Sequence, residues 1–197
     1  MDFSLSQDQT MIKKMTRDFA VKELEPIAAK TDEEARFPAE SIKKMAELGL
    51  LGLGLPEKYG GSGGAIELCL VTEELSRVCA STGAILLAST GLTGNPLATF
   101  GSEEQRQRFV TPIATGQKLA AFALTESGAG SDPAALLTTA SRKENGYVLN
   151  GTKIFITNGA EAEIILVFAT IDPALKHKGI TAFVVEKGVK GFSVGKL

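Results

Sequence analysis

The residues best suited to chemistry lie in one glycine-rich stretch, Leu124 to Asp132, with the sequence LTESGAGSD. Gly128 and Gly130 let a backbone approach a ligand closely, because they carry no side chain. Thr125 and Ser131 supply hydroxyl groups, and successive backbone amides in such a loop can form a concavity that binds an anion or a carbonyl oxygen. The same composition is typical of an ordinary turn between two strands, so the loop alone leaves both interpretations open.

A second stretch, Asn150 to Gly159 (NGTKIFITNG), predicts a strand between two Asn-Gly turns. Side chains alternate along a strand, so Phe155 and Thr157 would share one face while Ile156 points to the other. An aromatic ring two residues from a hydroxyl could stack on a flat heteroaromatic ring and hydrogen-bond its edge. An ordinary core strand has the same pattern, and this segment alone does not separate the two.

Carboxylates that could act as a general base are plentiful, but their surroundings argue against that role. Most lie in charged, helix-like stretches where a solvated face is expected; these are Glu23, Glu25, Glu33, Glu34, Glu73, Glu74, Glu103 and Glu104. Glu126 differs because it lies inside the glycine-rich loop, and we expect it to be structural and to accept backbone hydrogen bonds. No residue of the chain is therefore assigned a catalytic role.

Other common catalytic motifs are missing from the sequence. It contains no G-x-G-x-x-G turn, no G-x-x-x-x-G-K-[ST] phosphate loop and no G-x-S-x-G nucleophile motif. The single histidine, His177, and the distant Cys69 and Cys79 do not make a zinc site. On one helix these cysteines would lie about 15 Å apart, too far for a disulfide, so we expect buried free thiols in a reducing compartment.

Composition and charge restrict the class of protein further. The chain has 197 residues, 44% of them hydrophobic, and a formal net charge of −2, so a basic surface for nucleic acid is not expected. The most apolar stretch, residues 83–100, is interrupted by polar residues and a proline. A bilayer span needs roughly 20 mainly apolar residues. We therefore expect a buried helix there, no membrane span, and a soluble cytoplasmic protein.

The first 117 residues carry helix signals. Ser6-x-x-Gln9 and Ser102-x-x-Gln105 are capping boxes, a pattern typical of helix starts. Apolar residues recur at helical spacing after Ser6, after Pro38 and over residues 65–78. Another helix is predicted from residue 83 and is expected to break at Pro96.

From residue 118 on, short β-branched or aromatic runs replace the helical spacing. They predict strands at 118–124, 136–142, 147–149, 154–157, 163–169 and 180–186, a hairpin turn at Asn145-Gly146 and another strand beginning at 191–194. The expected fold class is α+β. An all-α helical domain over residues 1–117 is followed by an incomplete antiparallel β-domain over residues 118–197.

Taken together, these segments resemble those of the acyl-CoA dehydrogenases, along nearly the whole chain and in the same order. Besides the helix that begins at Ser6, the matching segments are RFP from Arg36, LPEKYGG from Leu55, EELS from Glu73, GSEEQ from Gly101, TESGAGSD from Thr125, NGTKIFITN from Asn150, GITAF from Gly179 and GFS from Gly191. Each segment alone is weak evidence for the family, but all of them in the same order make the resemblance specific. The pattern is most similar to the bacterial short-chain, butyryl-CoA type.

This resemblance implies a helical N-terminal domain, a middle β-domain and a C-terminal four-helix domain, with FAD and the acyl thioester between the last two. Thr125 would bond the polar edge of the flavin, and Ser131 would contact the acyl-CoA. Phe155 would pack against the isoalloxazine, and Thr157 would hydrogen-bond near its reactive nitrogen. The full set of cofactor-binding residues that the resemblance implies is Phe122, Ala123, Leu124, Thr125, Ser131, Phe155, Ile156 and Thr157.

In this family a base removes the proton α to the thioester carbonyl, and the β-hydrogen leaves as hydride to the flavin. That base is a glutamate of the C-terminal domain, which lies outside these 197 residues, so we expect the chain to be a fragment that is inactive alone. The resemblance also implies a role in fatty acid metabolism, an acyl-CoA substrate, electron transfer flavoprotein as a partner, and a homo-oligomer when full length.

Two alternatives remain. The chain could be a non-enzymatic acyl-CoA or flavin-binding module, including a split-gene partner of a separate C-terminal half, or it could belong to an acyl-CoA oxidase. One departure from the family pattern bears on all of them, because Ser127 stands where the family usually has proline. Without the fixed φ of proline, a looser loop with weaker ligand contacts is expected.

Overall fold

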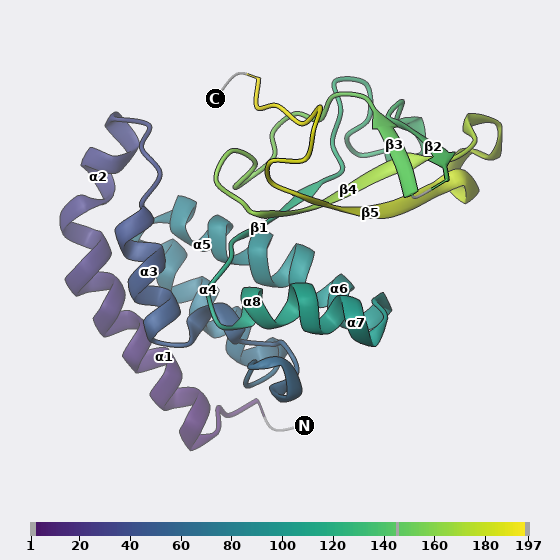
Figure 1. The fold of residues 1–197 in the computed structure, drawn as a ribbon. Coiled ribbons are helices and arrows are strands. Elements are labelled where there is room, and N and C mark those ends of the chain that lie inside the picture. Colours follow the sequence, from purple (N-terminus) through teal and green to yellow (C-terminus); the bar gives the residue numbers. More distant parts are fainter. Residues whose placement is uncertain (1–2, 145, 196–197) are drawn as a thin grey trace. The chain divides into compact units, whose positions relative to one another are not determined.

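The computed structural model describes residues 3–144 and 146–195, and within them the chain forms two compact units (Figure 1). The first unit ends at Lys118 and the second begins at Leu119. The first is built of helices and the second around a sheet. The predicted order of a helical part followed by a β part is confirmed.

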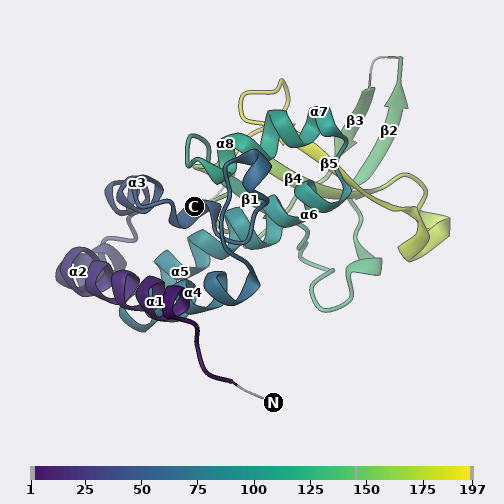
Figure 2. The same cartoon turned by 90° about the horizontal axis from the view of Figure 1, so that it is seen from below.

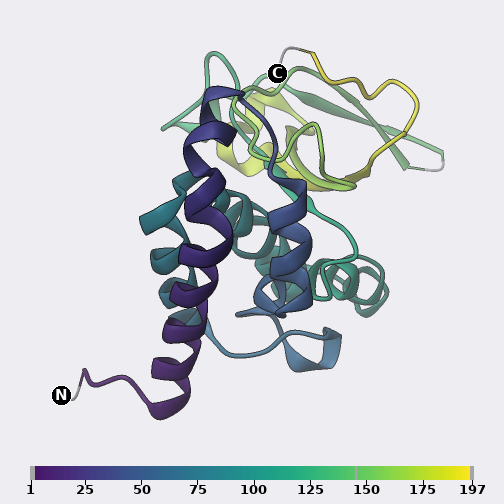
Figure 3. The ribbon, with the colours of Figure 1, turned by 90° about the vertical axis from the view of Figure 1, so that its left-hand side faces the viewer.

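The helical unit contains eight α-helices among its described residues, joined by short 3₁₀ and π-helical segments. Figure 3 shows α1, η1 and α2 following one another in a single rod. The α-helices are α1 (Gln7–Phe19), α2 (Glu25–Glu33), α3 (Ala39–Glu47), α4 (Ala65–Val78), α5 (Ala80–Leu86), α6 (Asn95–Phe100), α7 (Glu103–Gln105) and α8 (Thr111–Ala114). The π-helical segments are η1 (Ala20–Leu24), η4 (Leu87–Gly94) and η5 (Arg106–Val110), and the 3₁₀ segments are η2 (Leu50–Gly52) and η3 (Glu57–Tyr59).

Both predicted capping boxes are confirmed. At the start of α1, the N–H of Gln9 donates to Ser6 Oγ (3.1 Å), and the N–H of Ser6 donates to Gln9 Oε1 (3.0 Å). Ser102 and Gln105 make the same pair of bonds at the start of α7. Each box satisfies donors that the first helical turn leaves without an intrahelical partner.

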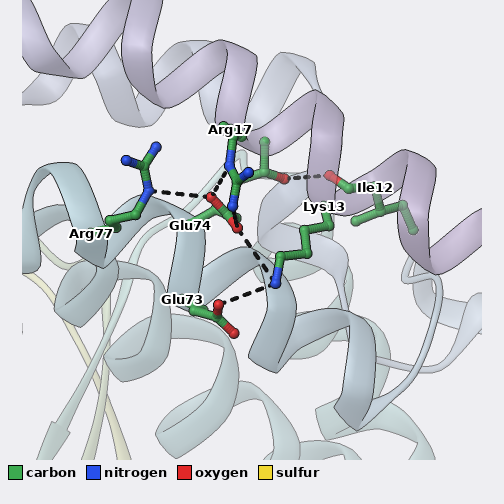
Figure 4. Close-up of polar contacts among 7 residues, drawn as sticks. Ile12, Lys13, Arg17, Glu73, Glu74 and Arg77 are labelled. Carbon is green, nitrogen blue, oxygen red and sulfur yellow. Dashed lines mark hydrogen bonds and ion pairs between the residues drawn. The ribbon is translucent and has the colours of Figure 1, made fainter. Parts of the chain in front are cut away.

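A buried carboxylate joins α1 to α4 (Figure 4). Glu74 of α4 is fully buried, and it accepts two hydrogen bonds from Arg17 of α1, from Nε at 2.8 Å and from Nη2 at 2.7 Å. Lys13 Nζ lies 3.7 Å from Oε1 of the same carboxylate, and Arg77 Nε lies 3.5 Å from Oε2. The expectation that Glu74 belongs to a solvated face is therefore wrong. Three surrounding cations compensate the carboxylate for the water that it loses on burial.

Prolines within the helical unit do not end its helices. Pro26, Pro96 and Pro112 are the second residues of α2, α6 and α8, and each of these helices directly follows one of the π-helical segments η1, η4 and η5. A proline lacks the N–H for the i−4 bond, and its ring collides with the i−4 carbonyl. The wider π turn releases that carbonyl before the proline arrives. The predicted break at Pro96 is wrong for this reason.

The described residues of the second unit form five strands, β1 (Ala120–Ala123), β2 (Thr139–Lys143), β3 (Gly146–Asn150), β4 (Ile164–Thr170) and β5 (Ile180–Glu186), together with the 3₁₀ segments η6 (Pro133–Ala135) and η7 (Pro173–Gly179). Strand β4 pairs with β1 in parallel and with β5 in antiparallel. It meets β2 in parallel at one position, and β2 forms an antiparallel hairpin with β3 (Figure 2). The sheet is mixed, so the antiparallel β-domain expected from the sequence describes the β2–β3 and β4–β5 pairs but not the pairing of β4 with β1 and β2. The long connection from β1 to β4 allows these two strands to run the same way.

Two predicted strands have no ladder partner among the described residues, those at 154–157 and 191–194. In the first, Phe155 has φ 55° and Asn158 has φ 65°, so the backbone leaves the extended region. The remaining predicted strands overlap β1 to β5. Of the predicted hairpin turn, Asn145 lies outside the described residues, and β3 begins at Gly146.

Both cysteines are free, but Cys69 is exposed and Cys79 is half-buried, so the expectation of buried thiols is wrong. Cys69 lies on the outer side of α4, and Cys79 follows the last residue of that helix. Among the described residues, no helix has both the length and the apolar character needed to cross a bilayer.

Candidate functional site

The glycine-rich loop begins where β1 ends, and its first half is a tight turn. The N–H of Glu126 donates to the Ala129 carbonyl (3.0 Å), and the N–H of Ala129 donates to the Glu126 carbonyl (3.1 Å). Ser127 and Gly128 form the tip. Because the N–H groups of Glu126 and Ala129 already bond inside the turn, these two groups are not available to bind an anion or a carbonyl oxygen.

The loop is open around its two glycines. A Cβ placed on Gly128 or Gly130 would meet no other atom of the described residues within 4 Å, and neither glycine has a positive φ. Ser131 is exposed next to Gly130. Asp132 is engaged locally, since its Oδ1 accepts the N–H of Ala134 (3.0 Å) at the start of η6. Space beside these glycines is thus available to a ligand.

Residues 151–158, which form an irregular segment, lie against β1 and the residues that follow it. The N–H of Ile154 donates to the Thr125 carbonyl (3.0 Å), and Asn158 Nδ2 donates to the Ala120 carbonyl (3.0 Å). The structure therefore brings the two stretches predicted to face one ligand, 122–125 and 155–157, next to each other.

The side chains of this segment differ in exposure, and the segment is not the predicted strand. Ile156 packs against a buried cluster formed by Ala121, Ala123, Ala162 and Ile165. Thr157 is exposed, and Phe155 is 91% exposed. Its positive φ costs about 1 kcal/mol for a residue with a side chain. Backbone strain and an exposed aromatic ring thus coincide at one residue, a combination typical of ligand-binding positions.

The other predicted residues differ in how much of the side chain is available. The ring of Phe122 is half-buried and lies 4.9 Å from that of Phe168, centroid to centroid. Leu124 and Thr125 are half-buried, and Ala123 is buried in the cluster, so only its backbone can face a ligand. Ser131 is exposed and lies beside Gly130 on the open side of the loop.

Glu126 and Lys153 form a buried ion pair between these two stretches. Lys153 Nζ donates to Glu126 Oε1 (2.7 Å) and to the Leu124 carbonyl (2.8 Å). The carboxylate also accepts the N–H of Leu137 (2.6 Å), the N–H of Thr138 (3.0 Å) and the hydroxyl of Thr138 (2.5 Å). The expectation that Glu126 is structural and accepts backbone hydrogen bonds is confirmed.

The contacts of Glu126 also fix its charge. Burial alone would raise the pKa of this carboxyl, but the hydrogen bonds from Lys153, Thr138 and the backbone N–H groups of Leu137 and Thr138 outweigh it and lower the pKa from 4.5 to about 2. A group that stays ionised and fully bonded at neutral pH is not suited to accept a substrate proton.

Two family models match the chain. The N-terminal domain of acyl-CoA dehydrogenases matches residues 6–117, and the middle domain of the same family matches residues 121–197. The chain belongs to the acyl-CoA dehydrogenase family. A curated relative from Clostridium acetobutylicum, named acyl-CoA dehydrogenase, short-chain specific, is 46% identical over all of this chain and over 52% of its own length.

Solved structures of other members agree. A chain in a structure described as the electron transferring flavoprotein of Acidaminococcus fermentans is 46% identical with a TM-score of 0.96, over 100% of this chain and 52% of that one. An acyl-CoA dehydrogenase complexed with FAD from Bacillus anthracis is 39% identical with a TM-score of 0.88, over 98% of this chain and 33% of that one. The chain spans about half the length of the curated relative that it matches.

Sequence reasoning missed two side chains of the 151–158 segment, Lys153 and Asn158. Both stand in the stretch NGTKIFITN, in which only the ring of Phe155, the hydroxyl of Thr157 and Ile156 between them were predicted to bind the cofactor. The available signal was the position of Lys153, a cation in an otherwise apolar run, which requires a buried anion or carbonyl nearby. Glu126 was the one carboxylate predicted to be structural, and it is that partner.

Proposed function

We propose that the protein containing this chain catalyses FAD-dependent α,β-dehydrogenation of a short-chain acyl-CoA thioester, and that residues 122–131 and 155–157 form one wall of its flavin and acyl site. The observation that carries the proposal is the adjacency of two stretches, joined by the bond from Ile154 N–H to the Thr125 carbonyl (3.0 Å). The family membership supports the reaction class, and the short-chain relative supports the substrate class.

The residues present fit a flavin. Phe155 exposes nearly its whole ring, and an aromatic ring gains by stacking on a flat heterocycle. Thr157 lies two residues after Phe155, and Thr125 lies next to this segment, because its carbonyl accepts the N–H of Ile154. Both threonines supply hydroxyl groups for the polar edge of the flavin ring. The open side of Gly128 and Gly130 leaves room for a ligand next to the backbone. An acyl-CoA dehydrogenase of the same family has been solved with FAD, which further supports the choice of cofactor.

Within this wall each residue has a separate task. Phe155 covers one face of the ring system and excludes water from it. The hydroxyls of Thr125 and Thr157 orient the ring by its polar edge, and that of Ser131 contacts the acyl-CoA. FAD, when bound, supplies the acceptor for the β-hydrogen of the thioester.

The proton acceptor lies elsewhere in the whole protein. Of the carboxylates in the described part of the loop, Glu126 is held ionised by Lys153 and its other donors, and Asp132 caps η6. We therefore expect the 197-residue chain alone to show no oxidation of butyryl-CoA with added FAD and an artificial electron acceptor. Appreciable turnover by the isolated chain would contradict this assignment of the base.

The decisive experiment uses the protein expressed from its complete coding sequence. We expect a yellow protein whose flavin absorption bleaches when butyryl-CoA is added without oxygen. Phe155→Ala should weaken FAD binding about tenfold, because stacking on an aromatic ring contributes on the order of 1–3 kcal/mol. Ile171→Ala is the matched control, since Ile171 is also an exposed apolar residue of the second unit but lies outside the proposed wall.

The outcomes separate the candidate functions. A colourless protein that takes up no FAD would contradict the proposed function. Bound flavin that butyryl-CoA does not reduce would favour a non-enzymatic binding module. Reoxidation by oxygen with peroxide would indicate an oxidase, whereas we propose reoxidation by electron transfer flavoprotein, which the similarity to the Acidaminococcus structure supports.

A further inference from the structure

The segment that carries Phe155 is held at both ends by side chains. Lys153 Nζ donates to the carbonyl of Leu124 at 2.8 Å, and Asn158 Nδ2 donates to the carbonyl of Ala120 at 3.0 Å. Ala120 is the first residue of β1, and Leu124 directly follows its last. The two side chains thus dock on carbonyls along β1, in the manner of a neighbouring strand.

The backbone between these two anchors does not hold itself in place. Phe155 and Asn158 both have positive φ, a region that residues with side chains disfavour. Among the described residues, one backbone bond, from Ile154 N–H to the Thr125 carbonyl, ties the segment to the residues after β1. A strained backbone with so little pairing persists only if its surroundings fix it.

Lys153 is itself fixed by Glu126. Their side chains are only 10% and 7% exposed, and their charged atoms lie 2.7 Å apart. Leu137 and Thr138 also donate to the carboxylate, with bonds of 2.5–3.0 Å. The carboxylate therefore links three stretches of chain, the glycine-rich loop, residues 137–138 and the segment that begins at Lys153.

Stability alone does not account for such a pair. Two apolar side chains of similar size would fill the same space without removing two charges from water, and such replacements are often neutral or favourable. The charges fix the direction of the Lys153 side chain, because its ammonium group must lie where it can donate to both Glu126 and the Leu124 carbonyl.

We propose that the Lys153–Glu126 pair, with Asn158 at the far end, is a positioning clamp that keeps Phe155 and Thr157 in register with Thr125. This inference rests on the proposed function, because register matters when these residues face one ligand. A site of this kind has to be held within about 0.5 Å of its working geometry.

The test compares three changes in the protein expressed from its complete coding sequence. The double variant Glu126→Gln/Lys153→Met removes the clamp without leaving a buried charge unpaired. Lys153→Arg keeps the charge and its donors. Lys187→Met is the matched control, because Lys187 Nζ also donates to two backbone carbonyls of the second unit, those of Ala160 (2.9 Å) and Glu161 (3.4 Å), yet stands outside the clamp.

Two readouts are needed, and one is independent of the cofactor. Without flavin, hydrogen exchange at the Ile154 amide should be about tenfold faster in the double variant than in the wild type, with little change in Lys187→Met. With FAD, the dissociation constant should rise about tenfold in the double variant, with an altered flavin absorption band. Lys153→Arg should keep both the exchange rate at Ile154 and the FAD dissociation constant close to the wild-type values.

Unchanged exchange and unchanged FAD affinity in the double variant would overturn the clamp, as would equal effects in Lys187→Met. If the wild type binds no FAD, the proposed function fails, and exchange at Ile154 by itself then decides whether the clamp exists. If the double variant does not fold, Asn158→Ala replaces it. That change leaves the ion pair intact and removes the other anchor, so the same shifts in exchange and affinity are expected, and their absence would overturn the proposal.

Discussion

Each unit buries a carboxylate among its described residues, and the two are compensated differently. Glu74 in the helical unit has three cations around it, and the side chains of Lys13, Arg17 and Arg77 are 29%, 51% and 50% exposed (Figure 4). Glu126 in the sheet unit has a single cation, Lys153, whose side chain is only 10% exposed. Its other donors are a hydroxyl and two backbone N–H groups.

This difference separates two uses of a buried charge. Around Glu74 the cations are redundant and partly hydrated, so the group joins α1 to α4 but does not depend on any one contact. Around Glu126 neither charge can return to water without local unfolding. The first arrangement secures packing, and the second fixes the direction of one side chain beside the candidate site.

The largest effect is expected when only one partner of the Glu126–Lys153 pair is removed. Lys153→Met leaves the carboxylate of Glu126 buried without a cation, and removing one partner of a buried pair costs about 3–5 kcal/mol. Hydrogen exchange resolved by peptide should show the loss in β1 and β4 and not in α4. The control Lys187→Met should stay within about 0.5 kcal/mol of the wild type. If Lys153→Met loses no more stability than Lys187→Met, the proposed difference between Glu74 and Glu126 is contradicted.

Acid should separate the wild type from the double variant Glu126→Gln/Lys153→Met. The folded state lowers the pKa of Glu126 from 4.5 to about 2, so the ionised form contributes stability that is complete above pH 4.5. That contribution, about 3 kcal/mol, is lost as pH falls from 4.5 towards 2. The sheet unit of the wild type should therefore lose stability over this window, measured by urea unfolding at each pH, and the double variant should lose less. Parallel pH profiles would contradict the assigned cause.

How far the sequence predicts these regions depends on whether a signal is local. The capping boxes at Ser6 and Ser102 are complete within four residues, and both were predicted correctly. Glu126 was predicted to be structural and to accept backbone hydrogen bonds because it lies inside the glycine-rich loop, which is a local signal. Glu74 was not, because its partners Arg17 and Lys13 are about 60 positions away in the sequence, and only the packing of α1 on α4 reveals them.

The candidate site shows the same division. The alternation of Phe155, Ile156 and Thr157 predicted a different face for Ile156 than for the other two, and in the structure Ile156 is packed whereas Phe155 and Thr157 are exposed. The strand itself was wrong, because the φ values of Phe155 and Asn158 are set by anchors on β1 that no local pattern encodes. The family resemblance supplied the roles of these residues, which the propensities alone left undecided.

Removing the other buried charge should cost less. Glu74→Gln keeps the shape of the side chain, and the three cations that it releases can regain water. Arg17 lowers the pKa of Glu74 through its hydrogen bonds, against the opposing effect of burial, so the loss is real but limited to about 2 kcal/mol. Exchange in α1 and α4 should report it. If Glu74→Gln lowers the free energy of unfolding as much as Lys153→Met or more, then having three cations around one carboxylate does not reduce the cost of losing the buried charge.

The smallest effect is expected at Ser127, and it tests whether the pair around Glu126 orders the adjoining loop. Ser127 is the first of the two tip residues between Glu126 and Ala129, a position where proline is favoured, and its N–H makes no hydrogen bond within the described residues. Ser127→Pro should therefore stabilise the wild type by about 0.4–1 kcal/mol, mainly by restricting the unfolded chain. In the Glu126→Gln/Lys153→Met background the loop is looser when folded, so proline should also supply order that the pair no longer provides. The gain there should exceed the wild-type gain by about 0.5 kcal/mol, measured as a coupling energy by urea unfolding. Equal gains in both backgrounds would mean that the loop keeps its conformation without the pair, and that the pair acts on the 153–158 segment alone.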